Sequence, residues 1–328
     1  MNETRRELLS ALEDGPVDGP TLADRVGVSR AAVWKQVEAL RAEGFVIASG
    51  DGGYRVVDVP EYGAAAVAFD LDAPYAVEYH DRLASTNDRA RELAADGAED
   101  VVVVADEQTG GRGRLDRTWT APAGGIWASL VLRPKCPPAE VPMYTLAAAV
   151  AVARAAREAG VEATIKWPND VLVPGADGDA RQLVGILTEM EGEADRVAWL
   201  VIGPGVNANV DRDALPPGAT SLRAEVGDVD RRRFLQRTLA TVHSLTGDGA
   251  DLRGVLDPWR EYASTLGRRV SIETPRGAVE GRAVDVRFPG SLIVETDDGE
   301  TVVGGETEEP DEVDPSAAPG LDEDEASA

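Results

Sequence analysis

The sequence predicts an α/β fold in which a central domain with a mixed sheet lies between a small helical unit and a small unit of short strands. Between residues 76 and 265, short apolar segments typical of buried strands alternate with longer segments of helical pattern, and this alternation indicates an α/β domain. Before this region apolar residues recur at helical spacing, and after Leu266 short strands are separated by Pro/Gly turns. We therefore expect three folded units.

Residues 1–58 are expected to form the first unit, built on a helix-turn-helix. Thr21 and Ser29 are suitable N-caps for two consecutive helices, and Gly27 suits the turn between them. The apolar positions that would give the helices a buried face are Leu8, Leu9, Leu12, Val33, Val37 and Leu40. This spacing predicts three helices around a small core.

Residues 45–47 and 51–55 are expected to pair as a two-stranded wing beside these helices. The combined pattern resembles the winged-helix DNA-binding domains, whose second helix of the motif enters the major groove. That resemblance implies DNA contacts at Arg30, Ala31, Trp34, Lys35 and Arg55. The alternative is a winged helix that serves dimerisation or packing only, because this unit lacks the positive charge that attracts phosphates.

Residues 59–75 are interpreted as a linker, because they contain two prolines, a glycine and a run of alanines. The central domain is expected over residues 76–265. Its expected strands cover 77–80, 101–105, 127–132, 165–172 (interrupted by a proline), 182–189 and 197–203. Its expected helices cover 86–95, 145–159 and 234–245.

Residues 266–305 are expected to form a small β-barrel. Four short strands are predicted at 270–274, 278–285, 292–295 and 301–303, with Gly-containing turns between them. Residues 306–328 carry ten acidic side chains and no basic one, so we expect an acidic, disordered tail.

The composition limits the classes of protein and site that are plausible. The 328 residues carry a formal net charge of −26 with only three lysines, and such an acidic surface favours a halophilic protein that stays soluble in high salt. One cysteine and two histidines exclude an internal disulfide and a Cys/His-rich metal centre. Since no signal peptide or membrane-spanning run is found, we expect a cytoplasmic protein without a membrane partner.

Residues 107–119 combine three glycines with three arginines, Arg112, Arg114 and Arg117. Glycine lets backbone amides approach a ligand closely, and the guanidinium group offers forked donors to phosphate oxygens. Such a loop suits a polyphosphate and is expected to be mobile until the ligand binds. Three further motifs accompany it: Ser85-Thr86-Asn87, Lys166-Trp-Pro-Asn169-Asp170 and Gly203-Pro-Gly-Val-Asn207.

In this order, between a winged helix and a small barrel, the four motifs resemble those of the bifunctional biotin protein ligases, which are also biotin operon repressors. The resemblance covers residues 1–305 and implies an SH3-like form for the C-terminal barrel. It implies an enzyme that uses ATP and Mg²⁺ to convert biotin into biotinyl-5′-AMP. The biotin is then transferred to a lysine of a biotin carboxyl carrier protein. Operator DNA and a second copy of the chain are the other partners that it implies.

The resemblance also implies roles for individual residues. Biotin contacts would come from Ser85, Thr86, Asn87, Gln108, Arg112, Gly113, Arg114 and Gln182. ATP and adenylate contacts would come from Arg117, Trp119 (against adenine) and Asn207. The catalytic set would be Arg112, Arg114, Lys166, Asn169, Asp170 (orienting the acceptor amine) and Gln182. Lys166 is equally interpreted as a structural ion-pair partner.

The sequence departs from the family pattern at three positions. Gln182 stands where the family has a lysine at the biotin carboxylate, and a neutral amide cannot supply that positive charge. Arg181 is the neighbouring candidate, although adjacent residues on a strand point to opposite faces. Asp116 replaces a glycine beside the arginines, and Pro204 replaces an apolar residue. These departures put the rate in question more than the ligand.

Two other functions remain open at this point. The first is a DNA-binding regulator that senses biotin or its adenylate and has weakened ligase activity, favoured by Gln182 and Asp116. The second is a lipoate-type ligase with the same catalytic fold, and the Gly/Arg loop and the winged helix argue against it. We prefer the biotin ligase, since the arginines and the Asn169-Asp170 pair are all present.

Overall fold

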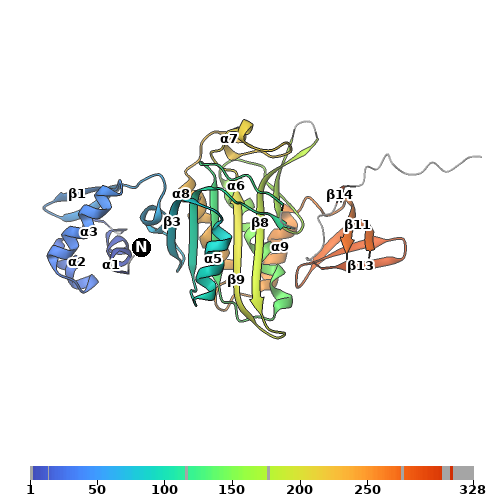
Figure 1. The fold of residues 1–328 in the computed structure, drawn as a ribbon, viewed down its shortest axis with the longest axis horizontal. Helices are drawn as coiled ribbons and strands as arrows, with labels where there is room; N and C mark the ends of the chain where they lie inside the picture. Colours follow the sequence, from blue (N-terminus) through green and yellow to red (C-terminus); the bar gives the residue numbers. More distant parts are fainter. Residues whose placement is uncertain are drawn as a thin grey trace, which may run out of the picture.

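A computed structural model of the chain describes residues 3–13, 15–114, 117–175, 178–274 and 277–304, and the backbone of Asp311–Glu312. Three units follow one another along the longest axis of the molecule, with the N-terminal unit at one end and the C-terminal sheet at the other (Figure 1). The central unit contains the large sheet. This arrangement agrees with the order of units expected from the sequence.

The N-terminal unit is a helix-turn-helix with a two-stranded wing. Its elements are α1 (Glu3–Glu13), α2 (Gly19–Val26), α3 (Arg30–Ala42), β1 (Val46–Gly50) and β2 (Gly53–Asp58). The expected cap of α2 is wrong: the helix begins earlier, and the Asp18 carboxylate accepts the Thr21 amide at 2.8 Å. An aspartate at this position also complements the positive helix end. Gly27 adopts φ 68°, and Ser29 caps α3 as expected.

The segment interpreted as a linker contains a short helix, α4 (Ala64–Ala68), that packs against both neighbouring units. Ala65 belongs to the core of the N-terminal unit, whereas Val67 belongs to the core of the central domain. The Gln236 side chain donates to the backbone oxygens of Val67, at 2.9 Å, and Phe69, at 2.5 Å. The segment therefore connects the two units through packed contacts.

The central sheet has seven strands in the order β3-β4-β5-β9-β8-β7-β6. The strands are β3 (Ala76–Leu83), β4 (Val101–Gln108), β5 (Ile126–Leu132), β6 (Thr164–Lys166), β7 (Asp170–Pro174), β8 (Ala180–Gly192) and β9 (Val197–Val206). Only the β3–β4 pair is parallel, and the other pairs are antiparallel. The sheet is therefore mixed, as expected.

Two details of the sheet differ from the sequence-based expectation. The expected single strand over 165–172 is instead the antiparallel hairpin β6–β7, in which Lys166 pairs with Asp170 across a turn containing a cis Trp167–Pro168 peptide bond. The strand expected over 197–203 is longer, because β9 continues through Gly203-Pro-Gly to Val206. Pro168 lies in the turn that separates β6 from β7, whereas β9 continues past Pro204 because its pairing with β8 is maintained there.

Helices cover both faces of the sheet. α6 (Pro142–Glu158), α8 (Arg231–Thr246) and α9 (Leu256–Tyr262) lie on one face, and α5 (Thr86–Ala95) lies on the other (Figure 1). Val102 and Val104 belong to the core under α6, whereas Val103 contacts the α5 side. This alternation is the strand period of two. The shorter helical elements are η2 (Pro138–Glu140), η3 (Arg212–Ala214), α7 (Leu222–Val226) and η4 (Leu252–Val255).

The C-terminal unit is an antiparallel sheet in the order β13-β12-β11-β10-β14. Its strands are β10 (Arg269–Thr274), β11 (Gly277–Arg287), β12 (Ser291–Thr296), β13 (Gly299–Val303) and β14 (Asp311–Glu312). β14 lies within the stretch expected to be a disordered tail, and its backbone pairs with β10. The rest of 306–328 lies outside the described residues. Trp167 joins this unit to the central domain, because its indole Nε1 donates to Gly290 O at 3.1 Å.

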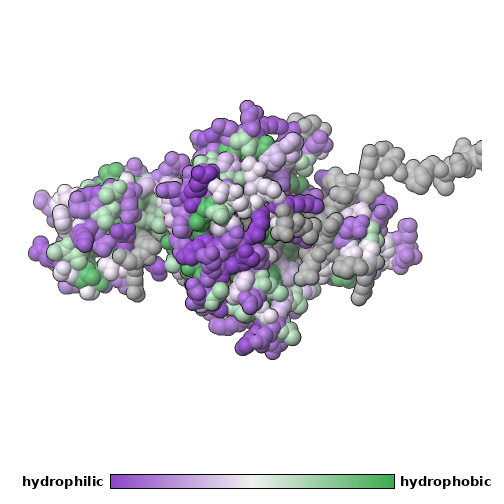
Figure 2. Space-filling model, viewed as in Figure 1, coloured by the Kyte–Doolittle hydropathy of each residue, from purple (hydrophilic) through white to green (hydrophobic). Residues whose placement is uncertain are grey.

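The surface of the central domain is largely polar on the face that Figure 2 shows, where hydrophilic residues dominate. Within the described residues, none of the helices combines the length and apolarity that crossing a membrane requires. The same part of the chain contains no group of three or more His, Cys, Asp or Glu side chains arranged to hold a metal ion.

Candidate active site

A pocket of about 180 Å³ lies on the α5 face of the central sheet, beyond the N-terminus of that helix. It brings together the ends of β4, β5, β7, β8 and β9 with the Gly/Arg loop. Of the predicted site residues, it is lined by Ser85, Thr86, Asn87, Gln108, Arg112, Gly113, Arg114, Arg117, Trp119, Asn169, Asp170 and Gln182. Lys166 and Asn207 do not line it. The four sequence motifs therefore converge on one pocket wall or adjoin it.

The Ser85-Thr86-Asn87 motif is held by its position at the start of α5. Ser85 is the N-cap, and its hydroxyl accepts the Asp88 amide at 3.3 Å. The Gln108 side-chain oxygen accepts the Thr86 amide at 2.6 Å and the Thr86 hydroxyl at 3.0 Å. Helix capping and this glutamine thus fix the polar groups that face the pocket.

Ser129 is a positioning residue that the sequence analysis missed. It is fully buried on β5, and its hydroxyl lies 2.8 Å from the Thr86 hydroxyl and 2.6 Å from Asn87 Oδ1. Asn87 also packs closely over β9, because a Cβ added at Gly203 would lie 2.0 Å from Asn87 Oδ1. A lone serine inside an apolar strand was the available signal, since a buried hydroxyl needs a partner.

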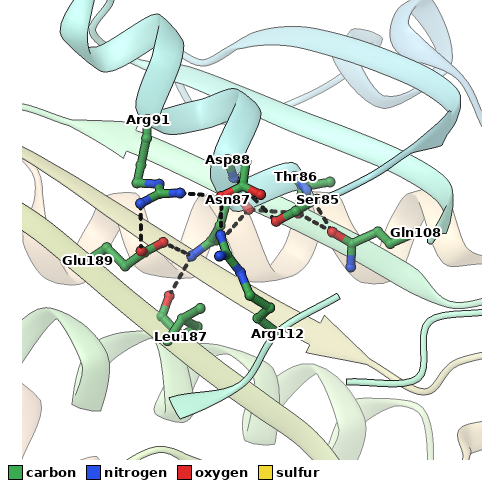
Figure 3. A network of polar contacts seen from close by, with 10 residues as sticks. Ser85, Thr86, Asn87, Asp88, Arg91, Gln108, Arg112, Leu187 and Glu189 are labelled. Carbon is green, nitrogen blue, oxygen red and sulfur yellow. Dashed lines mark hydrogen bonds and ion pairs between the residues drawn. The ribbon is translucent and has the colours of Figure 1, made fainter. Parts of the chain in front are cut away.

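Asn87 begins a chain of polar contacts along the pocket edge (Figure 3). Its amide nitrogen donates to Glu189 Oε2 at 2.8 Å. Glu189 pairs with Arg91 at 3.4 Å, and Arg91 pairs in turn with Asp88. Asp88 also forms an ion pair with Arg112 of the Gly/Arg loop. The sequence analysis assigned no role to Asp88, Arg91 or Glu189.

The Gly/Arg loop folds back on itself over the pocket. Arg112 and Thr118 form a β-bridge, and the Gly113 amide donates to Arg117 O at 2.7 Å. Arg114 Nη1 reaches across to Asn169 Oδ1 at 3.2 Å. The described part of the loop therefore lies over the site, and its expected mobility before ligand binding stays a prediction. Asp116, one of the three departures from the family pattern, lies outside the described residues.

Trp119 forms part of the pocket floor. Its ring lies over Gly185 of β8 and Gly205 of β9, which face each other in the strand register. A Cβ at either glycine would come within 2.9 Å of the indole. The indole Nε1 is buried without a hydrogen-bond partner. The paired glycines therefore create the space that this aromatic side chain occupies.

Asn169 and Asp170 are buried at the start of β7. Asn169 Nδ2 donates to Ile186 O at 3.1 Å, which fixes the side chain that meets Arg114. Asn207 lies outside the pocket lining; its Nδ2 donates to Thr220 O at 3.0 Å, and its Oδ1 is buried without a partner. Lys166 is half-buried on β6, opposite Asp170 in the hairpin.

The remaining departures lie at the pocket itself. Gln182 lines it from β8, whereas its neighbour Arg181 does not, as the alternation of side chains along a strand requires. Pro204 also lines it and pairs with Ile186 in the register of β8 and β9. Between β9 and β5 the pairing is interrupted at Gly203–Pro204, because proline has no amide hydrogen to donate.

The predicted DNA-contacting residues are all exposed, and they lie on two elements of the N-terminal unit. Arg30, Ala31, Trp34 and Lys35 are exposed along α3, and Arg55 is exposed on the wing strand β2. The Trp34 side chain is 58% exposed, which is unusual for an indole without a partner surface. This face of the N-terminal unit is thus free of internal packing.

Known protein families match three stretches of the chain. Residues 79–207 match the biotin/lipoate A/B protein ligase family, residues 4–55 match a helix-turn-helix domain family, and residues 242–328 match a family of unknown function.

The chain is 38% identical to the bifunctional ligase/repressor BirA of Bacillus subtilis, over 89% of this chain and 93% of that protein. It is 33% identical to the biotin–[acetyl-CoA-carboxylase] ligase of Paracoccus denitrificans, over 68% and 95% of the two chains. Among solved structures, it is similar to the Aquifex aeolicus biotin protein ligase in complex with biotin and ATP. That match has 25% identity and a TM-score of 0.58, and it covers 71% of this chain and 97% of the other. The chain therefore belongs to the biotin protein ligase family, within its group of bifunctional ligase/repressors.

Proposed function

We propose that this protein is an ATP-dependent biotin ligase that forms biotinyl-5′-AMP and transfers biotin to a lysine of a biotin carboxyl carrier protein. The observation that carries the proposal is the convergence of the Ser-Thr-Asn start of α5, the Gly/Arg loop and the Asn169-Asp170 turn on one pocket. These segments are far apart in the sequence, and a shared ligand site accounts for the polar side chains that they bring to one pocket.

The chemistry proceeds in two steps. A carboxylate oxygen of biotin attacks the α-phosphorus of ATP, and the bond to the leaving pyrophosphate breaks. The acceptor lysine amine then attacks the carbonyl carbon, an amide forms, and AMP and a proton leave. Negative charge grows on the phosphate oxygens during the first step, and Arg112, Arg114 and Arg117 lie where they can stabilise it. The closed loop would protect the mixed anhydride from water.

Biotin itself is assigned to the part of the pocket at the polar start of α5, beside the Trp119 ring. Its uncharged ring system suits a pocket with few, well-oriented polar groups, such as Thr86, Asn87 and Gln108. Gln182 is assigned to the biotin carboxylate, where it would donate an amide hydrogen bond. Trp119 and Asn207 are assigned to the adenine side; Trp119 lines the pocket, whereas Asn207 is buried outside its lining.

Mg²⁺ is assigned to the nucleotide and not to a cage of protein ligands. This ion commonly binds substrate phosphates with one or two carboxylates, and the described residues offer no group of three or more metal-ligating side chains. Asp170, buried in the pocket lining, is the carboxylate that fits such a contact. When bound, the ion would offset charge on the phosphates. In the transfer step, Asp170 and Asn169 would orient the acceptor amine.

The carrier protein is assigned to a second, more apolar cavity beside the active site. This cavity, of about 790 Å³, lies between the central domain and the C-terminal sheet. It shares Arg114 and Asn169 with the active-site pocket. Its edges include Met190 and Val302, two apolar side chains that are largely exposed. A carrier domain seated there would bring its lysine to Asn169.

Several finer assignments belong to the same proposal. The exposed face of α3 and the wing would bind operator DNA, so that the protein also represses transcription. The active repressor would be a homodimer, and the C-terminal sheet would be an SH3-like barrel. The acidic composition supports a halophilic, cytoplasmic protein.

A regulator with weakened catalysis is the second candidate, because Gln182 lines the pocket without the usual positive charge. A lipoate-type ligase is the third. Exchange of labelled pyrophosphate into ATP separates all three, when measured in high KCl with biotin or with lipoate. Biotin-dependent exchange supports the ligase. Binding of biotin without exchange would favour the regulator, and exchange that depends on lipoate would favour the third candidate.

A further inference from the structure

We propose that Asp88 is a positioning residue that holds Arg112 at the edge of the pocket and releases it to the phosphate of the ligand. This inference rests on the proposed function, since it assumes that Arg112 binds an anionic phosphate group. The Arg112 guanidinium forms an ion pair with the Asp88 carboxylate (Figure 3). Asp88 was not among the residues expected to act at the site.

Arg112 is placed to serve both partners. It lines the active-site pocket, and it also borders a shallow groove on the outer side formed with Asp88, Arg91, Glu92 and Trp199. The side chains of Arg112 and Asp88 are 39% and 38% exposed. A rotation about the side-chain bonds of an exposed arginine is fast and inexpensive, so the guanidinium can turn from the groove to the pocket.

Asp88 has a second cation that stays with it. Arg91 lies one helical turn further along α5 and pairs with the same carboxylate oxygen, Asp88 Oδ1. Arg91 itself is fixed by Glu189 at 3.4 Å. Asp88 therefore remains paired with Arg91 after Arg112 turns away. This avoids the penalty of leaving a partly buried charge without a partner.

The arrangement makes Asp88 and the ligand phosphate competitors for one guanidinium group. Neutralising Asp88 should therefore strengthen ligand binding, because the bound phosphate no longer has to displace an anion. Salt screens exposed ion pairs, so molar KCl weakens the competing Asp88 contact together with the ligand contact. The affinity of the natural protein should consequently fall less steeply with KCl than that of a variant without the Asp88 charge.

The test uses the full-length protein and a stable phosphate-containing adenylate analogue, biotinol-5′-AMP. Asp88→Asn removes the competing charge, and Asp88→Ser is a second neutral variant in case the first folds poorly. Glu92→Gln is the matched control, since Glu92 lies on the same helix, pairs with Arg89 at 3.0 Å and changes the net charge equally. Binding is measured between about 0.1 and 2 M KCl, and KM for ATP is measured from pyrophosphate release.

We expect Asp88→Asn to bind the analogue about 3–10-fold more tightly than the natural protein at low KCl, as breaking one exposed ion pair allows. The difference should shrink as KCl rises, and it should appear in KM for ATP and not in kcat. In an Arg112→Ala background the Asp88 substitution should have no effect.

An Asp88 variant that binds the analogue like Glu92→Gln, or more weakly than the natural protein, would overturn the inference. So would an effect of equal size in the Arg112→Ala background, because Asp88 would then act through another group. In these cases the natural protein still releases pyrophosphate and the proposed function stands. If the natural protein neither binds the analogue nor releases pyrophosphate, the proposed function fails and this inference fails with it.

Discussion

Arg114 Nη1 donates a hydrogen bond to Asn169 Oδ1 at 3.2 Å. This contact joins the Gly/Arg loop to the turn between β6 and β7, and it closes one wall of the pocket. Asn169 is fixed from behind by Ile186 O, so the arginine is held by a group that cannot easily move. The Gly/Arg loop and the Lys166-Trp-Pro-Asn169-Asp170 motif therefore meet directly.

Arg114→Ala should slow formation of the adenylate by about 10²–10³-fold, the loss found when one preorganised charge stabiliser is removed. The measurement is single-turnover release of pyrophosphate with saturating biotin and MgATP. Arg82→Ala is the control, because Arg82 pairs with Glu107 on the exposed surface outside the pocket lining. A loss of less than threefold at Arg114 would remove this residue from the catalytic set.

Gly205→Ala should lower biotin affinity at least 10-fold. The added Cβ would lie 2.9 Å from the Trp119 indole nitrogen, so the ring must move into the space assigned to the ligand, at a cost typical of overpacking. Isothermal titration with biotin measures the effect. Gly254→Ala serves as control, since a Cβ there meets nothing within 4 Å. Equal affinities for the two variants would show that Trp119 does not shape the biotin site.

Gln182→Lys should lower the KM for biotin and speed adenylate formation, because it places a positive charge at the pocket where the biotin carboxylate is assigned. Arg181→Gln should leave the KM for biotin nearly unchanged, since Arg181 does not line the pocket. Steady-state pyrophosphate release at varied biotin concentration measures both. A larger loss at Arg181 than gain at Gln182 would mean that Arg181 binds the carboxylate.

Asp100→Asn should raise the melting temperature by about 1–3 °C at pH 7. Burial and the neighbouring Glu99 raise the pKa of the Asp100 carboxyl, so its ionised form destabilises the fold at neutral pH. Asp100 also has φ 53°, a left-handed conformation that asparagine tolerates well.

The upward direction of the Asp100 pKa shift determines how this gain in melting temperature depends on pH. A carboxyl with a raised folded-state pKa is neutral in both states once the pH falls below its unfolded value, so the advantage of Asp100→Asn should disappear below about pH 4. Scanning calorimetry from pH 3 to 8 measures it, with Asp297→Asn at an exposed turn as control. A gain that persists at pH 3 would assign the effect to the backbone alone.

Lys35→Ala should weaken binding to the operator and lower the salt dependence of the binding constant by about one unit of slope, as expected for one lost phosphate contact. Lys35 lies on the exposed face of α3. Electrophoretic shift or fluorescence titration with biotin operon DNA, over a range of KCl, tests this. Lys135→Ala is the control, because Lys135 lies in the central domain, between β5 and η2. Identical slopes for the two variants would separate Lys35 from the DNA contact.

Much of the fold follows from local pattern. The apolar runs of β4 and β5, the caps at Ser29 and Ser85, and the glycine-separated C-terminal strands are each fixed by neighbouring residues. The convergence of the site could also be predicted, because the motifs occur in a recognisable order. Both inferences depend on short-range signals that a single sequence displays directly.

The remaining features depend on contacts between distant residues. Ser129 and Glu189 position Asn87 from other strands; the lone serine in an apolar strand indicates a buried hydroxyl that needs a partner, but the sequence does not show that Asn87 is that partner. Gly185 and Gly205 gain meaning only when the register places them face to face under Trp119. The Asp88–Arg112 ion pair likewise requires the fold of the loop over α5. Register and tertiary contact decide these features, and local pattern does not encode them.

The central claim is that this protein joins biotin to a carrier lysine, and the most direct test is transfer in high KCl. Purified protein, biotin, MgATP and a carrier domain are incubated, and pyrophosphate release and the mass of the carrier are followed together. The account predicts one biotin added to the acceptor lysine, in step with pyrophosphate release, and no transfer when ATP or biotin is omitted. A carrier that stays unmodified while the protein binds biotin would contradict it.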